Sequence, residues 1–140
     1  ELRGAMQSIL EVVDIALPSF DDEALLWGDA DPDATLTRLE RAGVAEIVVK
    51  DGPRDVAYSV AGQRGRAPTP DVASVRDTTG AGDAFNAGYL AARLVGRDPL
   101  ASCRTGQQVA GAVIGHYGAL APVEALATVR DAIRDQAAVR

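Results

Sequence analysis

The feature that most constrains the fold is a pair of short apolar runs separated by helical patterns. The first run covers residues 12–17 and stops at Pro18, and the clearer second run covers residues 45–49. An uninterrupted apolar stretch such as residues 47–49 is typical of a strand buried on both faces of a sheet. Because the residues between the runs have helical spacing, the order predicts an α/β fold with a mainly parallel sheet flanked by helices.

Helix signals occupy the segments around these strands. A hydroxyl followed by acidic residues favours a helix over residues 23–27 that ends near Gly28. Either Asp33 or Thr35 is suited to open the next helix, which Gly43 is expected to cap. Further helices are predicted over residues 5–11, 84–95, 99–117 and 123–137.

The middle of the chain carries weaker strand signals. Residues 57–60 alternate in polarity and predict an antiparallel hairpin partner for the strand at residues 45–49. Residues 62–71 are rich in Gly, Pro and Arg and predict an irregular crossing. Residues 72–76 predict a short strand that leads into the next motif.

The strongest functional signal is the heptapeptide at residues 77–83, which reads Asp-Thr-Thr-Gly-Ala-Gly-Asp and is followed by a small-residue helix pattern. Gly80, Ala81 and Gly82 allow a tight turn that a ligand can approach closely, and their N–H groups lie where a helix would start. Helix starts bind anions such as phosphate. Asp83 falls in the first helical turn, so that a carboxylate and several amides converge on one group. This arrangement predicts phosphoryl transfer.

Composition limits the partners that the chain can take. The 140 residues are 47% hydrophobic and predict a single folded domain over residues 1–140. A formal charge of −6 argues against a nucleic-acid partner. No stretch approaches about 18 uninterrupted apolar residues, so no membrane partner is expected. A single cysteine, Cys103, cannot form an internal disulfide, and we therefore expect a cytoplasmic protein.

The heptapeptide and the residues after it, Ala-Phe-Asn-Ala-Gly-Tyr at 84–89, resemble the C-terminal signature of the PfkB, or ribokinase-like, carbohydrate kinases. Residues 48–52 resemble the strand and loop that approach the nucleotide in that family, and Gly118 with Ala119 resembles its last nucleotide-proximal turn. The resemblance runs over residues 12–120. It implies the C-terminal, nucleotide-binding part of a ribokinase-like fold, without the N-terminal half and the lid.

The resemblance implies ATP-dependent phosphorylation of a small sugar or sugar acid, with Mg2+ as the metal ion. Asp83 would be the general base, and the amides of Gly80, Ala81 and Gly82 would form the anion hole. Residues 17–24 are similar to the 2-keto-3-deoxygluconate kinases, which makes this sugar acid the favoured substrate. A ribokinase or fructokinase specificity is one alternative. A nucleotide-binding or interaction fragment without turnover is another.

The resemblance also assigns residues around the nucleotide. Lys50 would lie near phosphate, or would only flank a strand end in solvent, and Gly52 would let the adenine lie against the backbone. Gln107 would lie near the adenine, with a partly exposed helix glutamine as the alternative. Gly118 would belong to the last nucleotide-proximal turn.

Asp77 and Thr79 are candidate ligands of a monovalent cation such as K+, because the family often uses such an ion beside the anion hole. Backbone carbonyls near Gly118 would complete that site. The alternative for both residues is helix capping and turn hydrogen bonding.

The sheet predicted for this chain has an apolar edge. Such an edge tends to pair with another chain. We therefore expect either a homo-oligomer or association with the missing N-terminal half.

Overall fold

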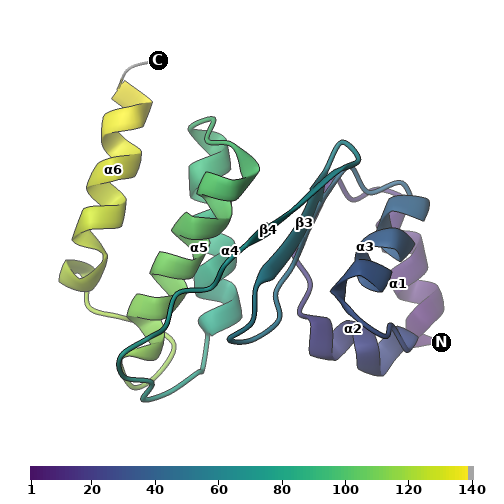
Figure 1. Ribbon diagram of the computed structural model, residues 1–140, viewed down its shortest axis with the longest axis horizontal. Helices are drawn as coiled ribbons and strands as arrows, with labels where there is room; N and C mark the ends of the chain where they lie inside the picture. The colour runs from purple at the N-terminus through teal and green to yellow at the C-terminus, as the bar shows by residue number, and fades with distance from the viewer. Residues whose placement is uncertain (139–140) are drawn as a thin grey trace. The chain divides into compact units, whose positions relative to one another are not determined.

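The computed structural model of the chain describes residues 1–138 and confirms the predicted α/β class. The chain divides into two compact units, Glu1–Pro68 and Thr69–Arg140. A four-stranded sheet and three helices make up the first unit, whereas helices and loops make up the second (Figure 1). In the part of the chain that the structure describes, no helix is long and apolar enough to cross a membrane.

The first unit contains the whole described sheet. Its elements are α1 (Leu2–Leu10), β1 (Ile15–Ala16), α2 (Phe20–Trp27), α3 (Pro32–Arg41), β2 (Glu46–Val49), β3 (Val56–Val60) and β4 (Gln63–Ala67). The strand order is β1-β2-β3-β4, in which β1 is parallel to β2 and the two later pairs are antiparallel. The sheet is therefore mixed rather than mainly parallel. Short loops join its last three strands as consecutive hairpins, and such loops can connect only antiparallel neighbours.

The predicted irregular crossing over residues 62–71 is wrong for its first part, because β4 follows β3 through a tight hairpin. Ala61 (φ 49°) and Gly62 (φ 77°) both have positive φ, the combination that a two-residue type I′ turn requires. Tyr58 pairs with Gly65 across the hairpin, and a Cβ at Gly65 would lie 2.3 Å from the Tyr58 hydroxyl oxygen. Glycine at this position leaves room for the tyrosine ring.

The core of the first unit lies between α3 and the sheet. Leu36 and Leu39 of α3 pack with Ile47, Val49 and Ala57 from β2 and β3. All four residues of β2 are buried, as the apolar run predicts. Burying each leucine side chain stabilises the fold by about 2 kcal/mol. The packing of α3 on the sheet thus buries residues of β2 and β3 in one core.

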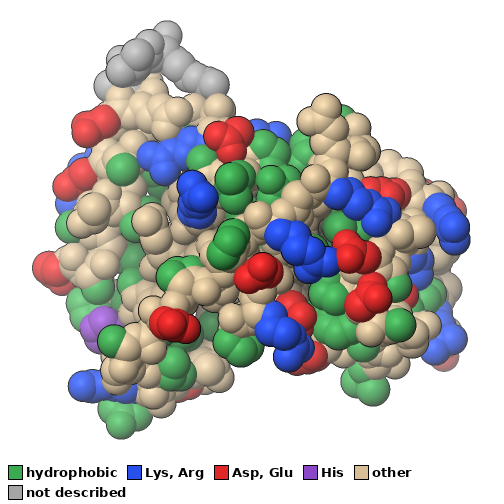
Figure 2. Space-filling model, viewed as in Figure 1, with side chains coloured by type: hydrophobic (Ala, Val, Ile, Leu, Met, Phe, Trp, Pro, Cys, Tyr) green, Lys and Arg blue, Asp and Glu red, His purple; other side chains and the backbone are tan. Residues whose placement is uncertain are grey.

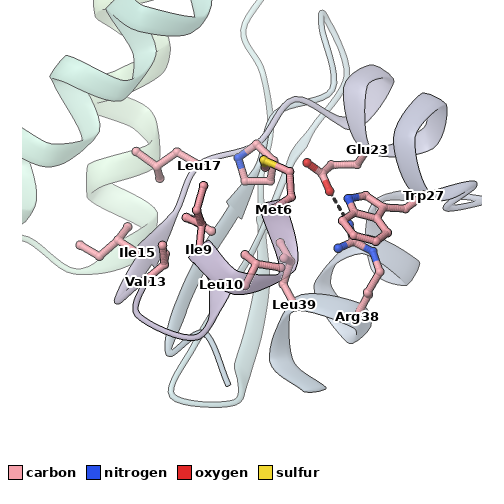
Figure 3. A pocket seen from close by; sticks show the side chains of 12 residues that line it. Met6, Ile9, Leu10, Val13, Ile15, Leu17, Glu23, Trp27, Arg38 and Leu39 are labelled. Atoms are coloured by element: carbon pink, nitrogen blue, oxygen red, sulfur yellow. Dashed lines mark hydrogen bonds and ion pairs between the residues drawn. The ribbon is translucent and has the colours of Figure 1, made fainter. Parts of the chain in front are cut away.

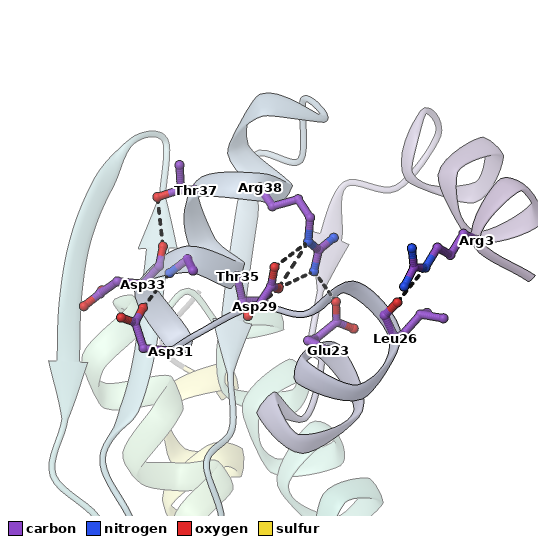
Figure 4. Close-up of polar contacts among 10 residues, drawn as sticks. Arg3, Glu23, Leu26, Asp29, Asp31, Asp33, Thr35, Thr37 and Arg38 are labelled. Atoms are coloured by element: carbon purple, nitrogen blue, oxygen red, sulfur yellow. Dashed lines mark hydrogen bonds and ion pairs between the residues drawn. The ribbon is translucent and has the colours of Figure 1, made fainter.

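The helix α3 begins earlier than predicted, with Asp31 as its N-cap residue. The Asp31 carboxylate accepts a hydrogen bond of 2.8 Å from the Ala34 N–H, and Pro32 occupies the first helical position. The expectation that Asp33 or Thr35 opens this helix is therefore wrong. Thr35 is fully buried and its hydroxyl donates to Asp29 Oδ2 over 2.8 Å (Figure 4).

A polar cluster around Arg38 joins α2 to α3. The Arg38 guanidinium donates to the carboxylates of Glu23 and Asp29 (Figure 4), and its Cζ lies 4.7 Å from the Trp27 ring centroid. Burial raises the pKa of Asp29, but hydrogen bonds from Arg38 and Thr35 outweigh it, so that this pKa lies below its usual value. The cluster therefore holds an ionised carboxylate in a largely buried position.

Charged side chains of both signs are interspersed over the first unit in the space-filling view (Figure 2). Two ion pairs between β4 and α3 contribute to this pattern, Arg64–Glu40 and Arg66–Asp33, each with an N–O distance of 2.5 Å. The arginines of β4 are thus neutralised by acids of the neighbouring helix.

The second unit is helical. Its elements are α4 (Ala81–Leu94), α5 (Pro99–Ile114), a 3-10 turn η1 (Val123–Leu126) and α6 (Ala127–Ala138). The helices α4 and α5 lie side by side (Figure 1). The strand predicted over residues 72–76 is absent, because the Arg76 N–H donates to the Ile114 carbonyl at the end of α5 (2.8 Å) instead of to a neighbouring strand.

Candidate active site

The glycine turn of the heptapeptide forms the start of α4, as predicted. Gly80 is the N-cap residue with φ 74°, and Asp83 lies in the first helical turn. The Ala84 N–H donates to the Gly80 carbonyl over 2.9 Å. The turn therefore places one carboxylate in the first turn of a helix whose N-terminus begins at a glycine. We call residues 80–83 the cradle.

Two independent constraints require glycine at position 80. Its φ lies in the left-handed region, where a side chain is unfavourable. A Cβ at this position would also lie 2.8 Å from the Ala119 Cβ. The cradle thus forms in close contact with the turn at residues 118–119.

The amides of the cradle differ in their hydrogen bonding. The Ala81 N–H donates to the Thr78 carbonyl over 3.1 Å and closes the turn. The next amides, those of Gly82 and Asp83, belong to the first turn of α4, where N–H groups have no intrahelical partner. An anion at this helix start would therefore meet the Gly82 and Asp83 amides more readily than the Ala81 amide.

Asp77 connects the cradle to the turn at residues 118–119. Its Oδ1 accepts a hydrogen bond of 2.9 Å from the Thr79 N–H, and its Oδ2 accepts one of 2.8 Å from the Gly118 N–H. Hydrogen bonds from the Thr79 side chain and from these two amides lower the pKa of Asp77. The structure thus brings Asp77, Thr79 and Gly118 together. It gives the Asp77 carboxylate a hydrogen-bonding role, whereas the role of Asp77 and Thr79 as cation ligands stays a prediction.

Lys50 and Gly52 belong to the first unit. Lys50 is half-buried at the end of β2, and its main chain pairs with residues 18–20 through bonds of 3.0 Å to the Pro18 carbonyl and 2.8 Å from the Phe20 N–H. Gly52 has φ 56°, and a Cβ built there would contact nothing within 4 Å. The approach of Gly52 to adenine and of Lys50 to phosphate both stay predictions.

Residues 2–126 match the pfkB family of carbohydrate kinases. The chain belongs to this family. The 2-dehydro-3-deoxygluconokinase of Escherichia coli (strain K12) is 41% identical over 130 residues, which make up 90% of this chain and 42% of that protein. The chain thus spans about two fifths of the length of this relative.

Solved structures of sugar and nucleoside kinases share the fold of this pfkB-family chain. The adenosine kinase of Sinorhizobium meliloti superposes with a TM-score of 0.83 at 27% identity, over 93% of this chain and 40% of that one. An E. coli protein described as a ribokinase II, solved with ATP and Mg2+, superposes with a TM-score of 0.77 at 26% identity, over 95% of this chain and 43% of that one. The resemblance to ribokinase-like kinases is confirmed.

Gln107, the predicted adenine neighbour in this pfkB-family chain, is buried in α5. The residue is 7% exposed, and its side-chain Nε2 donates a hydrogen bond of 2.9 Å to Thr69 Oγ1. The alternative of a partly exposed helix glutamine is therefore wrong. An approach of Gln107 to adenine stays a prediction.

One polar pair near the predicted nucleotide loop was not found from the sequence. Asp51 is buried and accepts two hydrogen bonds from the Arg54 guanidinium, 2.7 Å from Nε and 2.6 Å from a terminal nitrogen. The pair fixes the loop that contains Gly52. The signal available in the sequence is an acid and an arginine three residues apart across a Gly-Pro turn.

A cavity in the first unit is lined by residues other than the predicted site residues. It has a volume of about 260 Å³ and none of the candidate site residues lines it (Figure 3). Its walls are mainly apolar and include Met6, Ile9, Leu10, Val13, Trp27 and Leu39. Glu23 and Arg38, which also line it, are paired with each other. Apolar walls and a neutralised ion pair offer little for phosphate chemistry, so the cradle is the better candidate.

Proposed function

We propose that this chain is the C-terminal, nucleotide-binding part of an ATP-dependent sugar kinase, and that both units belong to that part. One observation carries the proposal: in a pfkB-family chain, a left-handed Gly80 caps α4 and leaves Asp83 in the first turn of that helix. Backbone amides at a helix start favour an anion, and a carboxylate beside them is suited to accept a proton.

The cradle fits a phosphate group, because Gly80 presents bare backbone and the helix dipole is positive at this end. ATP would supply the phosphoryl group, with Mg2+ to neutralise its charge. In this proposal the cradle amides hold the transferring phosphate, chiefly those of Gly82 and Asp83, because the Ala81 N–H donates to the Thr78 carbonyl. One such donor contributes about 3 kcal/mol to the transition state. Asp83 accepts the proton of the sugar hydroxyl, a role that typically contributes about a hundred- to ten-thousand-fold in rate.

The proposed substrate is 2-keto-3-deoxygluconate, also named 2-dehydro-3-deoxygluconate. The 41% identity to an E. coli 2-dehydro-3-deoxygluconokinase over 90% of this chain supports this choice. A ribose or fructose kinase is the alternative within the same family. For the nucleotide, the structural likeness to a protein solved with ATP and Mg2+ gives support. A monovalent cation held by Asp77 and Thr79 is a separate part of the proposal.

A second function is nucleotide binding without turnover. The chain spans about two fifths of the length of the curated relative that it matches, which favours this reading for the 140 residues alone. Both functions place the nucleotide phosphates at the cradle, and they differ only in whether a sugar is phosphorylated.

The two functions can be separated by measuring binding and transfer. Calorimetric titration of the 140-residue chain with a non-hydrolysable ATP analogue and Mg2+ tests the cradle. A coupled kinase assay on the full-length protein that contains this sequence, with 2-keto-3-deoxygluconate, ribose and fructose, tests transfer. Binding together with transfer to the sugar acid is the expected result. Binding without transfer to any sugar would support the second function, and no binding would contradict both.

A further inference from the structure

We infer that Asp77 is a positioning residue, which holds the cradle in its binding geometry by clasping together two backbone segments that lie 41 residues apart. The inference rests on the proposed function, because it concerns how the same cradle is kept ready for a phosphate. In this role the Asp77 carboxylate acts through its two hydrogen bonds to backbone amides, which need no bound ion.

The geometry of the clasp uses both carboxylate oxygens. The bond from Oδ1 to the Thr79 amide is local and orders the turn before α4. The bond from Oδ2 to the Gly118 amide is long-range and ties that turn to the loop after α5. A residue that only caps the turn would need the first bond alone. The second bond is therefore the part that a local capping role leaves unexplained.

The Gly118 bond has a direct consequence for the cradle. Ala119, the next residue, lies against Gly80 so closely that a Cβ there would meet the Ala119 Cβ at 2.8 Å. If residues 118–119 moved away from Asp77, Gly80 would lose its close contact with Ala119. The position of the first α4 amides follows from the position of Gly80, because Gly80 is the N-cap residue of that helix.

Backbone hydrogen bonds hold Asp77 itself in place. The N–H groups of Arg76 and Asp77 donate to the Ile114 carbonyl at the end of α5, over 2.8 and 3.3 Å. The segment before the cradle is thus attached to the same helix end from which the Gly118 loop departs. The backbone hydrogen bonds to Ile114 hold the segment before the cradle beside the end of α5. The Asp77 carboxylate adds the hydrogen bond from the Gly118 N–H to this arrangement.

The first experiment needs no ligand. Amide hydrogen exchange is measured by NMR on the 140-residue chain and on Asp77→Asn, which keeps one acceptor oxygen, and Asp77→Ala, which keeps none. Because each lost hydrogen bond to a carboxylate frees an amide, we expect the Thr79 and Gly118 amides to exchange about ten-fold faster in Asp77→Ala, with a smaller change in Asp77→Asn. Amide shifts at Gly80 and Gly82 should change with them. Unchanged exchange at Gly118 would overturn the clasp.

The second experiment measures nucleotide affinity with and without K+. A clasp predicts that Asp77→Ala weakens binding of ATP with Mg2+ by about ten-fold in both buffers, because a smaller fraction of the chain has a competent cradle. If the weakening appears only with K+, Asp77 acts on nucleotide binding through the cation alone, and the clasp is overturned. Asp131→Asn is the matched control, since among the described residues Asp131 forms an exposed pair with its neighbour Arg130 on α6. It should leave both measurements unchanged.

The failure of the proposed function is distinguishable from the failure of this inference. If the unmodified chain does not bind ATP, the proposed function fails, while the exchange data still decide whether Asp77 holds Gly118 beside the cradle. If ATP binds and Asp77→Ala binds it equally well, the cradle functions without the clasp and the inference fails alone.

Discussion

Gly88 of α4 packs against the main chain of α5 so closely that a Cβ on it would lie 2.9 Å from the carbonyl oxygen of Thr105. Gly106 mirrors this contact, since its own Cβ would lie 2.8 Å from the Phe85 carbonyl oxygen. The two helices are therefore in backbone contact. Because α4 starts at the cradle, this contact determines where the cradle lies relative to α5.

Replacing Gly88 by alanine should lower the free energy of unfolding of the chain by about 1 to 3 kcal/mol, because the added methyl group forces α4 and α5 apart. Urea denaturation measures the change. Gly111→Ala is the matched control in α5, where the nearest neighbour of a new Cβ is a Val72 methyl at 3.7 Å. That variant should be slightly more stable than the unmodified chain, as alanine suits a helix better than glycine. Equal effects of the two changes would contradict the contact.

Gly80→Ala should combine backbone strain with a steric clash. We expect the midpoint of denaturation to fall and ATP to bind at least about ten-fold more weakly, because the left-handed φ costs about 1 kcal/mol or more and the Ala119 contact adds to it. Gly28→Ala is the control, since Gly28 has a similar φ of 80° but open space around it. A loss of stability in Gly80→Ala that does not exceed that of Gly28→Ala would argue against the Ala119 contact.

The Asp29 carboxylate predicts a specific dependence of stability on pH. Its pKa is lowered in the folded protein, so the stability that it contributes is present above the unfolded value of about 3.9 and is lost as the pH falls through the lower folded value. Asp29→Asn should therefore destabilise the chain at pH 7 by about 1 to 3 kcal/mol. The difference from the unmodified chain should shrink below about pH 4. Denaturation curves across this range test it, and a constant difference at every pH would count against the ionised carboxylate.

Asp83→Asn in the full-length protein should lower turnover by at least about a hundred-fold and leave ATP affinity nearly intact, because it removes the proposed base and keeps the shape of the side chain. Steady-state kinetics and calorimetry give the two quantities. Asp131→Asn serves as the control for a removed surface charge. Unchanged turnover would rule out Asp83 as the base.

The exposed edge at the short strand β1 predicts that the chain associates with another chain. In the described part of the chain β1 pairs with β2 alone, and Ile9, Val12 and Ile15 nearby are exposed. Such an edge favours pairing with another chain. Light scattering should show an oligomer of the 140-residue chain, or strong binding of a hydrophobic dye if it stays monomeric. A compact monomer with low dye binding would contradict this expectation.

Local sequence patterns predicted most elements because their signals are short-range. The buried run of β2, the cap Gly28 and the helix start at the cradle each depend on neighbouring residues, and the structure has them in place. The hairpin before β4 escaped prediction because Ala61 adopts a left-handed φ that alanine alone does not favour. Pairing with β3 stabilises that turn, and such pairing is not visible in the residues of the turn.

The sequence by itself determined the glycine turn and the helix start of the cradle, because the left-handed φ of Gly80 and the place of Asp83 in the first turn follow from residue type and spacing. Only the tertiary structure decided what surrounds them. The Asp77–Gly118 bond and the Gly88–Thr105 contact join residues 41 and 17 positions apart. Contacts of that kind depend on how helices pack, so no local pattern could predict them.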